Sequence, residues 1–262
     1  MTQPWYTHPY LRGLEPGSGA WFQAQNALIR EKPLVKRCYD MWYGHMLADC
    51  ASVPGCGSIV ELGSGSCYVK QLRPSVITTD VAPGVADAVI DGRSLPFADA
   101  SVRALLLCHV FHHIPDVRRF LEEARRVLVP GGVISMVDVT HTPFGKFFFS
   151  RFHPEPYDDA AVQWSFPEGH TLLDSNQALT WMVFSRDRAV FERLFPELRL
   201  ERCEYLPWLG YLLSGGVNLR SFVHRFLAPA VAGLDWVLKP LDGVFAVHWR
   251  LTLRKVAGSP RQ

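Results

Sequence analysis

The chain has 262 residues, of which 48% are hydrophobic and 20% are charged. This size and composition allow one large α/β domain with a sizeable core and exclude an intrinsically disordered chain. Twenty-seven Lys and Arg residues against 25 Asp and Glu residues give a net charge of +2. Such a balance argues against nucleic acid as the main partner.

Cysteine usage and the N-terminal sequence bear on the cellular compartment. No two of the six cysteines form a CxxC pair, which predicts reduced thiols and no disulfide framework. Residues 1–17 lack the basic and apolar segments of a signal peptide. The longest uncharged run, 205–219, contains Pro207 and is shorter than the ~20 apolar residues of a spanning helix. We therefore expect a cytoplasmic protein without a transmembrane helix.

The first half of the chain alternates between helical and strand patterns. Apolar positions at helical spacing in residues 20–51, interrupted by Pro33, predict two helices. Short apolar runs then alternate with polar stretches, which is typical of a parallel sheet buried on both faces. Helix 117–128 has a clear apolar stripe, and Pro130-Gly131-Gly132 ends it. The predicted strands are Ser58–Leu62, Val76–Asp80, Ala88–Asp91, Ala104–Cys108 and Val133–Val139.

After Thr140 the pattern changes to an aromatic, proline-interrupted stretch that reaches about Ser185 and is longer than an ordinary βα connection. A helix over 186–194, a strand over 198–205, an apolar helical segment over 222–241 and a strand over 245–253 are predicted to follow. For the apolar residues of 222–241 we favour core packing. A weak contact with a membrane surface is the alternative, against which the thin polar face of the segment argues.

The stretch VELGSGS at 60–66 is a strand that runs directly into a glycine turn. Glycines allow a tight turn and the close approach of a ligand, which a Cβ would block. Eighteen residues after Leu62, Asp80 ends a second strand, where a carboxylate can accept hydrogen bonds from both hydroxyls of a ribose. Asp91 ends the third strand, and Cys108 to Asp116 follow the fourth. Each signal alone is modest, and their order and spacing carry the interpretation.

With these motifs the chain resembles the class I S-adenosylmethionine-dependent methyltransferases of the small-molecule type. The resemblance covers about residues 58–138 and, weakly, the last strands. It implies a doubly wound α/β fold with helices on both faces of a mostly parallel, seven-stranded sheet of order 3-2-1-4-5-7-6. The matching stretches are VELGSGS at 60–66, TTD at 78–80, DGRSLPFADASV at 91–102, LLLCHVFHHIPD at 105–116 and FLEEARRVLVPGGVISMVD at 120–138.

The resemblance also implies the residues that bind S-adenosylmethionine. Gly63 and Gly65 would approach the methionine portion, Asp80 would bind the ribose and Asp91 the adenine. The full predicted set is Glu61, Gly63, Ser64, Gly65, Asp80, Val81, Asp91, Gly92, Cys108 and His109. One departure from the family pattern is Cys67, which stands where the third glycine of ExGxGxG is usual, and the helix after it is short.

The resemblance, together with the changes in sequence pattern along the chain, predicts four segments. Residues 1–52 form an N-terminal helical segment or lid, and residues 53–140 form the cofactor-binding half of the domain. Residues 141–185 form an insertion that binds the acceptor, and residues 186–262 complete the sheet.

Two other functions remain open. An NAD(P)-dependent oxidoreductase also has a glycine turn and a strand-end acid, but it requires GxGxxG, and position 68 is Tyr. A catalytically silent module that binds S-adenosylmethionine is the second alternative, to which Cys67 is the only hint.

Catalysis by in-line methyl displacement needs a base only if the acceptor must lose a proton early. His112 and His141, which follow the fourth and fifth strands, are the predicted catalytic residues. Three histidines after the fourth strand also suggest a metal site, but no carboxylate or cysteine lies at a suitable spacing, so we expect no metal. The candidate bases are His109, His112, His113, Asp138, His141 and His170.

The acceptor is expected to be a small molecule, apolar or lipid-like in character. Aromatic residues accumulate between residues 144 and 166, and most of them are predicted to form a satellite core. Some of them would line an apolar acceptor pocket. They are Phe144, Phe147, Phe148, Phe149, Phe152, Tyr157, Trp164 and Phe166.

Overall fold

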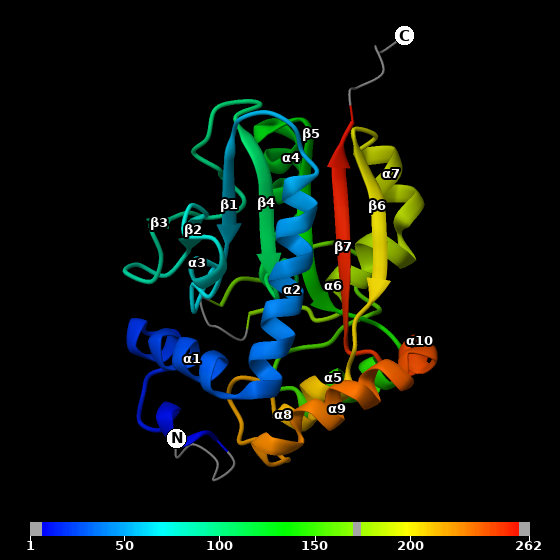
Figure 1. The fold of residues 1–262 in the computed structure, drawn as a ribbon. Coiled ribbons are helices and arrows are strands. Elements are labelled where there is room, and N and C mark those ends of the chain that lie inside the picture. Colours follow the sequence, from blue (N-terminus) through cyan, green and yellow to red (C-terminus); the bar gives the residue numbers. More distant parts are fainter. Residues whose placement is uncertain (1–6, 170–173, 257–262) are drawn as a thin grey trace.

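A seven-stranded sheet of order β3-β2-β1-β4-β5-β7-β6 forms the centre of the molecule in this computed structural model, which describes residues 7–169 and 174–256 (Figure 1). Strands β1 to β5 pair in parallel, whereas β7 runs antiparallel to both β5 and β6. The predicted fold class is confirmed. The strands are β1 (Ser58–Leu62), β2 (Ile77–Asp80), β3 (Ala88–Val89), β4 (Val102–Cys108), β5 (Leu128–Val139), β6 (Leu198–Tyr205) and β7 (His248–Lys255).

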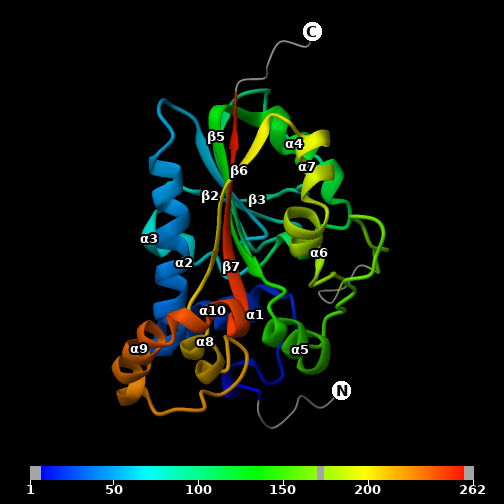
Figure 2. The same ribbon diagram turned by 90° about the vertical axis from the view of Figure 1, so that its right-hand side faces the viewer.

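Helices cover both faces of the sheet (Figure 2). Helix α2 lies with α3 on one face, and α4, α6 and α7 lie on the other, which produces two separate hydrophobic clusters. The helices are α1 (Gly19–Glu31), α2 (Pro33–Ala51), α3 (Val69–Leu72), α4 (Val117–Val127), α5 (Pro143–Phe152), α6 (Leu179–Trp181), α7 (Arg188–Leu194), α8 (Leu209–Ser214), α9 (Ala228–Val237) and α10 (Asp242–Phe245).

Local sequence signals set several of these boundaries. The Ser18 hydroxyl accepts a hydrogen bond from the Trp21 amide and caps α1. Pro33 begins α2, because a first helical residue needs no amide donor. The two predicted N-terminal helices and the break at Pro33 are therefore confirmed.

Several predicted boundaries are wrong. Strand β3 ends at Val89 and not at Asp91, and β4 begins at Val102 and not at Ala104. Strand β5 begins at Leu128 and not at Val133, because Leu128 already pairs with Val102; the register then shifts across Pro130-Gly131-Gly132, where Gly131 has a φ of +80°, and pairing resumes at Val133. Strand β7 begins at His248 and not at residue 245, because residues 242–245 form α10. The predicted helix over 186–194 starts as a π-helical turn, Met182–Arg186, which runs almost directly into α7.

One end of the molecule gathers the elements that can surround a ligand. Strands β1, β4 and β5 point toward this end, where α1, α5, α8, α9 and α10 lie together (Figures 1 and 2). The carboxyl edge of a parallel sheet is where doubly wound folds bind ligands. The helices at this end come from both halves of the sequence.

Most apolar residues of 222–241 are exposed, although core packing was expected for them from the sequence. Phe222 and Phe226 are 70% and 71% exposed, and Val231 alone is buried among the apolar residues of α9. Helix α9 is anchored through a polar contact, in which the Asp235 carboxylate accepts hydrogen bonds from the amides of Leu209 and Gly210. Its apolar side chains therefore remain largely at the surface.

Part of the aromatic stretch after Thr140 forms the predicted satellite core. Phe149 is buried there beside Phe144, Phe148 and Tyr157. Trp164 and Phe166 pack instead against the main core, and Phe147 and Phe152 are exposed. No helix in the described part of the chain is both long and apolar enough to cross a bilayer. The division into four segments stays a prediction.

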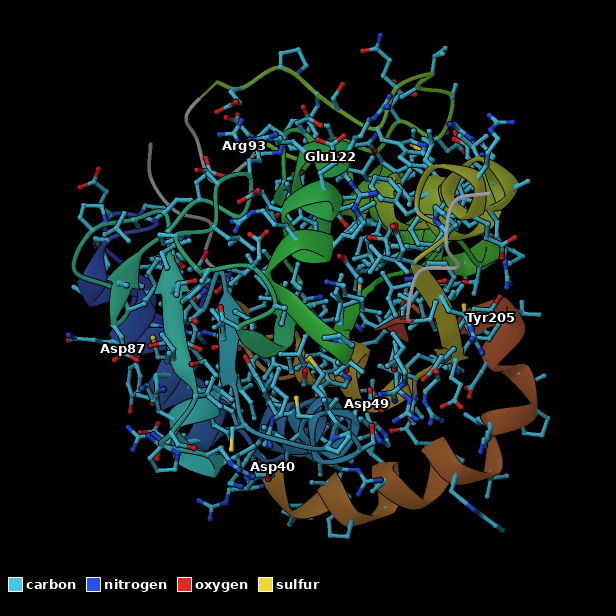
Figure 3. The ribbon with its side chains drawn as sticks, turned by 90° about the horizontal axis from the view of Figure 1, so that it is seen from above. Asp40, Asp49, Asp87, Arg93, Glu122 and Tyr205 are labelled. Carbon is cyan, nitrogen blue, oxygen red and sulfur yellow. The ribbon has the colours of Figure 1, made fainter. Side chains whose placement is uncertain are left out.

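Helix α2 is joined to the sheet by Asp49. Its carboxylate accepts hydrogen bonds from the hydroxyls of Ser135 on β5 and Thr252 on β7, each at 2.7 Å. Figure 3 shows Asp49 on the α2 side of the sheet and Glu122 on the opposite side, on α4. The contact ties α2 to two neighbouring strands that run in opposite directions.

We expect Asp49→Ala to lower the free energy of unfolding by about 1–3 kcal/mol, because two hydroxyls at the sheet surface lose their acceptor. Urea denaturation followed by circular dichroism measures the change. Glu122→Ala, which removes a carboxylate that only approaches Arg118 and Arg119 at the surface, is the matched control and should change stability by less than about 0.5 kcal/mol. Equal effects of the two substitutions would contradict this role of Asp49.

Candidate active site

The glycine turn after β1 lies against two other elements. Gly63 has a φ of +59°, and a Cβ on it would lie 2.7 Å from Cγ2 of Val110, in the loop after β4. Gly65 has a φ of +46°, and a Cβ there would lie 3.1 Å from the ring of Phe22 on α1. Gly63 requires glycine, since a side chain there would meet backbone strain and a neighbour at once, and Gly65 favours glycine for the same two reasons.

Asp80, at the end of β2, contacts this turn directly. Its Oδ2 accepts a hydrogen bond from the Gly65 amide at 2.9 Å, and its Oδ1 accepts one from the Ala82 amide at 3.0 Å. Each carboxylate oxygen can accept a further hydrogen bond. The structure therefore brings together the glycine turn and the acid that the sequence predicted to act jointly.

Ser64 and Cys67 give the turn its shape. The Ser64 amide donates to the Thr79 carbonyl at 2.8 Å, and the Thr79 amide donates to Ser64 Oγ at 3.1 Å, which joins the turn to β2. Cys67 has a φ of +52°. The backbone thus keeps the left-handed conformation that the missing third glycine would adopt freely.

Glu61 is buried beneath the turn. The Tyr43 hydroxyl of α2 donates to its Oε1 at 2.6 Å, while its Oε2 has no hydrogen-bond partner in the described part of the chain. Burial raises the pKa of Glu61 to about 7, although the hydrogen bond from Tyr43 acts in the opposite direction. Glu61 therefore links the turn to α2.

Asp91 and its neighbours lie at the same edge of the sheet with a different orientation. The Asp91 carboxylate pairs with Arg93 at 2.6 Å, which lowers its pKa, and Arg93 also pairs with Glu168. Gly92 lies beside Leu62 at the end of β1. Val81 is 68% exposed. The structure thus places Gly92 beside the last residue of β1, and it directs the Asp91 carboxylate to a guanidinium.

After β4 the chain enters a group of aromatic rings. His109, which follows Cys108, has a φ of +58° and packs its ring 4.8 Å from Trp42 and 4.6 Å from His248. Tyr211 packs 4.4 Å from His248. Desolvation by these neighbours lowers the pKa of His109. We refer to Trp42, His109, Tyr211 and His248 as the aromatic cluster.

Three polar atoms of the aromatic cluster are buried without a hydrogen-bond partner in residues 7–169 and 174–256: Trp42 Nε1, His109 Nε2 and His248 Nδ1. Buried polar atoms usually have partners, so unpaired ones indicate a place where a ligand or water binds. The sequence analysis missed Trp42, Tyr211 and His248, because α2, α8 and β7 meet only in the folded chain.

His112 lies in a single 3-10 turn, Phe111–His113, and is buried. Its Nδ1 pairs with Asp138 at the end of β5, and its Nε2 lies 3.4 Å from Glu155 Oε2. Burial alone would lower the pKa of His112, but the attraction of Asp138 and Glu155 outweighs this effect and raises it to about 10. Both ring nitrogens are therefore engaged by carboxylates.

His141, the second predicted catalytic residue, lies elsewhere. Its ring stacks on Trp181 with centroids 3.8 Å apart, and its Nδ1 contacts the Tyr157 hydroxyl. Its Nε2 lies 3.7 Å from Asp159. No contact joins His141 to the glycine turn in the part of the chain that the structure describes. His170 falls outside the described residues.

Two surface hollows of about 610 and 690 Å³ lie away from these residues. The first is at the opposite edge of the sheet, between Asp99 and Lys255, and the second lies beside Asp116 and Trp164. Neither is lined by the glycine turn, Asp80 or the aromatic cluster. The candidate active site therefore lies at the strand ends and not in either of these two hollows.

Comparison with known proteins agrees with the fold and the turn. Residues 55–136 match a family model described as a methyltransferase domain. Residues 55–136 therefore carry a methyltransferase domain, and the strand order of the sheet agrees with the class I methyltransferase fold. Geranyl diphosphate C-methyltransferase from Streptomyces coelicolor A3(2) shares the fold of this methyltransferase domain with a TM-score of 0.50 and 13% identity, over 96% of this chain and 89% of that one.

Two relatives match the methyltransferase domain in sequence. An uncharacterized methyltransferase of Mycobacterium sp. (strain JLS) is 29% identical over 50% of this chain and 53% of the relative. A demethylmenaquinone methyltransferase of Corynebacterium glutamicum is 28% identical over 51% of this chain and 60% of the relative. The chain thus spans little more than half the length of the curated relatives that it matches.

S-adenosylmethionine is the methyl donor of this class of domain, and the geometry of the glycine turn fits it. Gly63 and Gly65 leave the backbone open where a side chain would intrude, and Asp80 offers hydroxyl-binding oxygens beside them. Helix α3 has only four residues, so its N-terminus has little of the helix dipole that favours a dinucleotide pyrophosphate. The residues present fit an adenosine-bearing sulfonium better than a dinucleotide.

We expect the stability of the wild-type protein without cofactor to fall between pH 4.5 and 7 because of Glu61. The folded state holds the proton with a pKa of about 7, against 4.5 for the free side chain, so the carboxyl becomes a buried charge as the pH rises. The Glu61→Gln variant cannot acquire this charge. The difference in unfolding free energy, variant minus wild type, should therefore increase by up to about 3 kcal/mol from pH 4.5 to pH 7.

Denaturant titrations at pH 4.5, 6 and 7.5 would measure this difference. Glu122→Gln is the control for removing an exposed carboxylate on α4. A difference between Glu61→Gln and wild type that stays constant with pH would show that Glu61 does not titrate in this way.

Proposed function

We propose that this protein transfers the methyl group of S-adenosylmethionine to a small, apolar acceptor. The observation that carries the proposal is the contact between the Gly65 amide and the Asp80 carboxylate, at the ends of β1 and β2. It lies within residues 55–136, which match the methyltransferase domain. A glycine turn joined to a strand-end acid is suited to adenosine recognition.

When bound, S-adenosylmethionine would supply a methyl group on a sulfonium, with S-adenosylhomocysteine as the leaving group of an in-line displacement by the acceptor. Asp80 would accept hydrogen bonds from the ribose hydroxyls, and the Asp91–Gly92 segment would contact the adenine. The protein otherwise needs to align the acceptor and exclude water. The proposed cofactor contacts are those predicted from the sequence: Glu61, Gly63, Ser64, Gly65, Asp80, Val81, Asp91, Gly92, Cys108 and His109.

The aromatic cluster supports an apolar acceptor with one polar group. Trp42 and Tyr211 contribute large apolar ring surfaces, while the unpaired nitrogens of His109 and His248 can bind a single oxygen. The cluster follows β4, whose loop contacts Gly63. The relative named demethylmenaquinone methyltransferase agrees with this acceptor class.

His112 and His141 stay predictions as catalytic residues. Asp138 and Glu155 occupy both nitrogens of His112, and His141 stacks on Trp181 with its Nδ1 in contact with the Tyr157 hydroxyl. In-line transfer to a nucleophilic acceptor requires no base. An acceptor that must lose a proton would require another group, such as the unpaired nitrogen of His109.

We expect Asp80→Asn to weaken the binding of S-adenosylhomocysteine at least tenfold, because a carboxylate binds ribose hydroxyls more strongly than an amide does. Isothermal titration calorimetry measures the affinity. Asp99→Asn, which alters a surface carboxylate at the opposite edge of the sheet, is the control and should leave binding unchanged.

The same calorimetry distinguishes the alternatives. Binding of NAD in place of S-adenosylmethionine would establish an oxidoreductase and refute the proposal. Tight binding of S-adenosylmethionine without turnover over a broad panel of quinols, phenols and prenylated acceptors would establish a silent binding module.

The exposed face of residues 222–244 supports contact with a membrane surface. Phe226 and Trp236 are 71% and 79% exposed. Arg220, Arg225 and Lys239 are also exposed there, whereas the two acidic residues of this segment, Asp235 and Asp242, are buried. Apolar side chains among exposed cations are complementary to a bilayer with anionic headgroups. An apolar acceptor would be drawn from such a surface.

We expect the protein to co-sediment with phosphatidylserine-containing vesicles at low salt, and less so as the salt concentration rises. Phe226→Ser/Trp236→Ser should reduce the bound fraction several-fold, because apolar insertion is lost. Val162→Ser, at an equally exposed apolar residue outside this face, is the control. No binding of the wild-type protein to anionic vesicles at low salt would refute the membrane contact.

A further inference from the structure

His112, His113 and Glu155 place three potential metal ligands together. Nε2 of His112 lies 3.4 Å and Nε2 of His113 lies 3.5 Å from the same oxygen, Glu155 Oε2. The three ligand atoms all lie within 4.8 Å of one another. Ligand atoms around a tetrahedral zinc ion are separated by about 3.3–3.4 Å, given zinc–ligand distances of about 2.0–2.1 Å. The two nitrogen–oxygen distances already match this spacing.

Both imidazoles are oriented as metal-binding histidines are. Nδ1 of His112 pairs with the Asp138 carboxylate, and Nδ1 of His113 lies 3.1 Å from the Asp174 carbonyl oxygen. In a neutral ring, an oxygen acceptor on Nδ1 keeps the proton there and leaves the lone pair on Nε2, so a metal ion would bind His112 with release of the proton that faces Glu155. Two independent acceptors, one a side chain and one a backbone group, thus direct both lone pairs toward Glu155.

The surroundings of Glu155 hold its carboxylate in place and leave one side of the cluster accessible. Gln177 donates to Glu155 Oε2 through its amide nitrogen, while its buried amide oxygen has no hydrogen-bond partner in the described part of the chain. The side chain of His112 is 3% exposed, that of Glu155 15% and that of His113 30%. An ion can therefore reach the cluster from the His113 side.

We propose that His112, His113 and Glu155 bind a divalent transition-metal ion, with zinc as the ion best suited to two imidazoles and one carboxylate. Asp138 and the Asp174 carbonyl act as positioning groups. Three protein ligands leave a fourth position open. Spacing along the sequence predicted no metal, because Glu155 lies 42 residues after His113 and approaches it only in the folded chain.

The cluster lies near the proposed acceptor site, because His112 and His113 follow His109 of the aromatic cluster in the same loop after β4. A catalytic role of the ion rests on the proposed methyl transfer, whereas metal binding does not. In that reaction an acceptor hydroxyl would occupy the open position. The ion would lower the pKa of that hydroxyl and favour the nucleophilic oxyanion. Loss of its proton to solvent would then need no histidine base.

Metal binding is tested on the full chain without cofactor, after removal of adventitious ions with a chelator. Titration with Co²⁺ should give a visible absorption band that saturates at one equivalent, and Zn²⁺ should abolish it. Glu155→Gln and His113→Ala should each weaken Co²⁺ binding at least tenfold. His224→Ala, at an exposed histidine remote from the cluster in sequence, should bind as wild type does.

Asp138→Asn keeps all three ligands and tests the positioning role, with an expected loss of about 10–100-fold in metal affinity. Circular dichroism establishes that each variant is folded. A folded wild-type chain that takes up neither Co²⁺ nor Zn²⁺ would overturn the proposal. Unchanged affinity in both Glu155→Gln and His113→Ala would do the same. Because S-adenosylmethionine is absent, these outcomes are independent of whether the protein proves to be a methyltransferase.

Discussion

The backbone of the turn after β1 passes so close to the loop after β4 that only hydrogen fits at the Gly63 Cα. A methyl group there would lie 2.7 Å from Val110, and the φ of +59° would disfavour any side chain. This contact fixes the distance between the two loops that carry the site. Asp80 is joined to the first loop through the Gly65 amide, and residues 109–113 belong to the second loop. The positions of both groups therefore depend on this contact.

The parts of the site that the sequence predicted correctly are encoded locally. Parallel strands end at one edge of a sheet, so the residues that follow the strand ends lie close together regardless of how the side chains pack. The pairing of Asp80 with the turn follows from this rule, whereas the strand order was implied by the resemblance to the class I methyltransferases. Even Cys67, which departs from the family pattern, keeps the positive φ of a glycine, because the neighbouring hydrogen bonds determine the backbone there.

Features that depend on distant segments could not be predicted. The aromatic cluster combines residues of α2, α8 and β7 with His109, and Glu155 reaches His112 from an irregular stretch without periodicity. The apolar residues of 222–241 were misinterpreted for a related reason. Helical spacing shows that a segment has an apolar stripe, but not whether another element covers it, and α9 rests on the domain through Asp235.

The position of β7 between β5 and β6 has a consequence for how the chain acquires its structure. Among the described residues, strand β6 pairs only with β7, which follows it by more than forty residues, so β5 and β6 both present unpaired edges until β7 is in place. Synthesis from the N-terminus can complete the β3-β2-β1-β4-β5 portion earlier. During that interval the nascent protein has an open β5 edge, at which intermolecular strand pairing and chaperone binding would compete with folding.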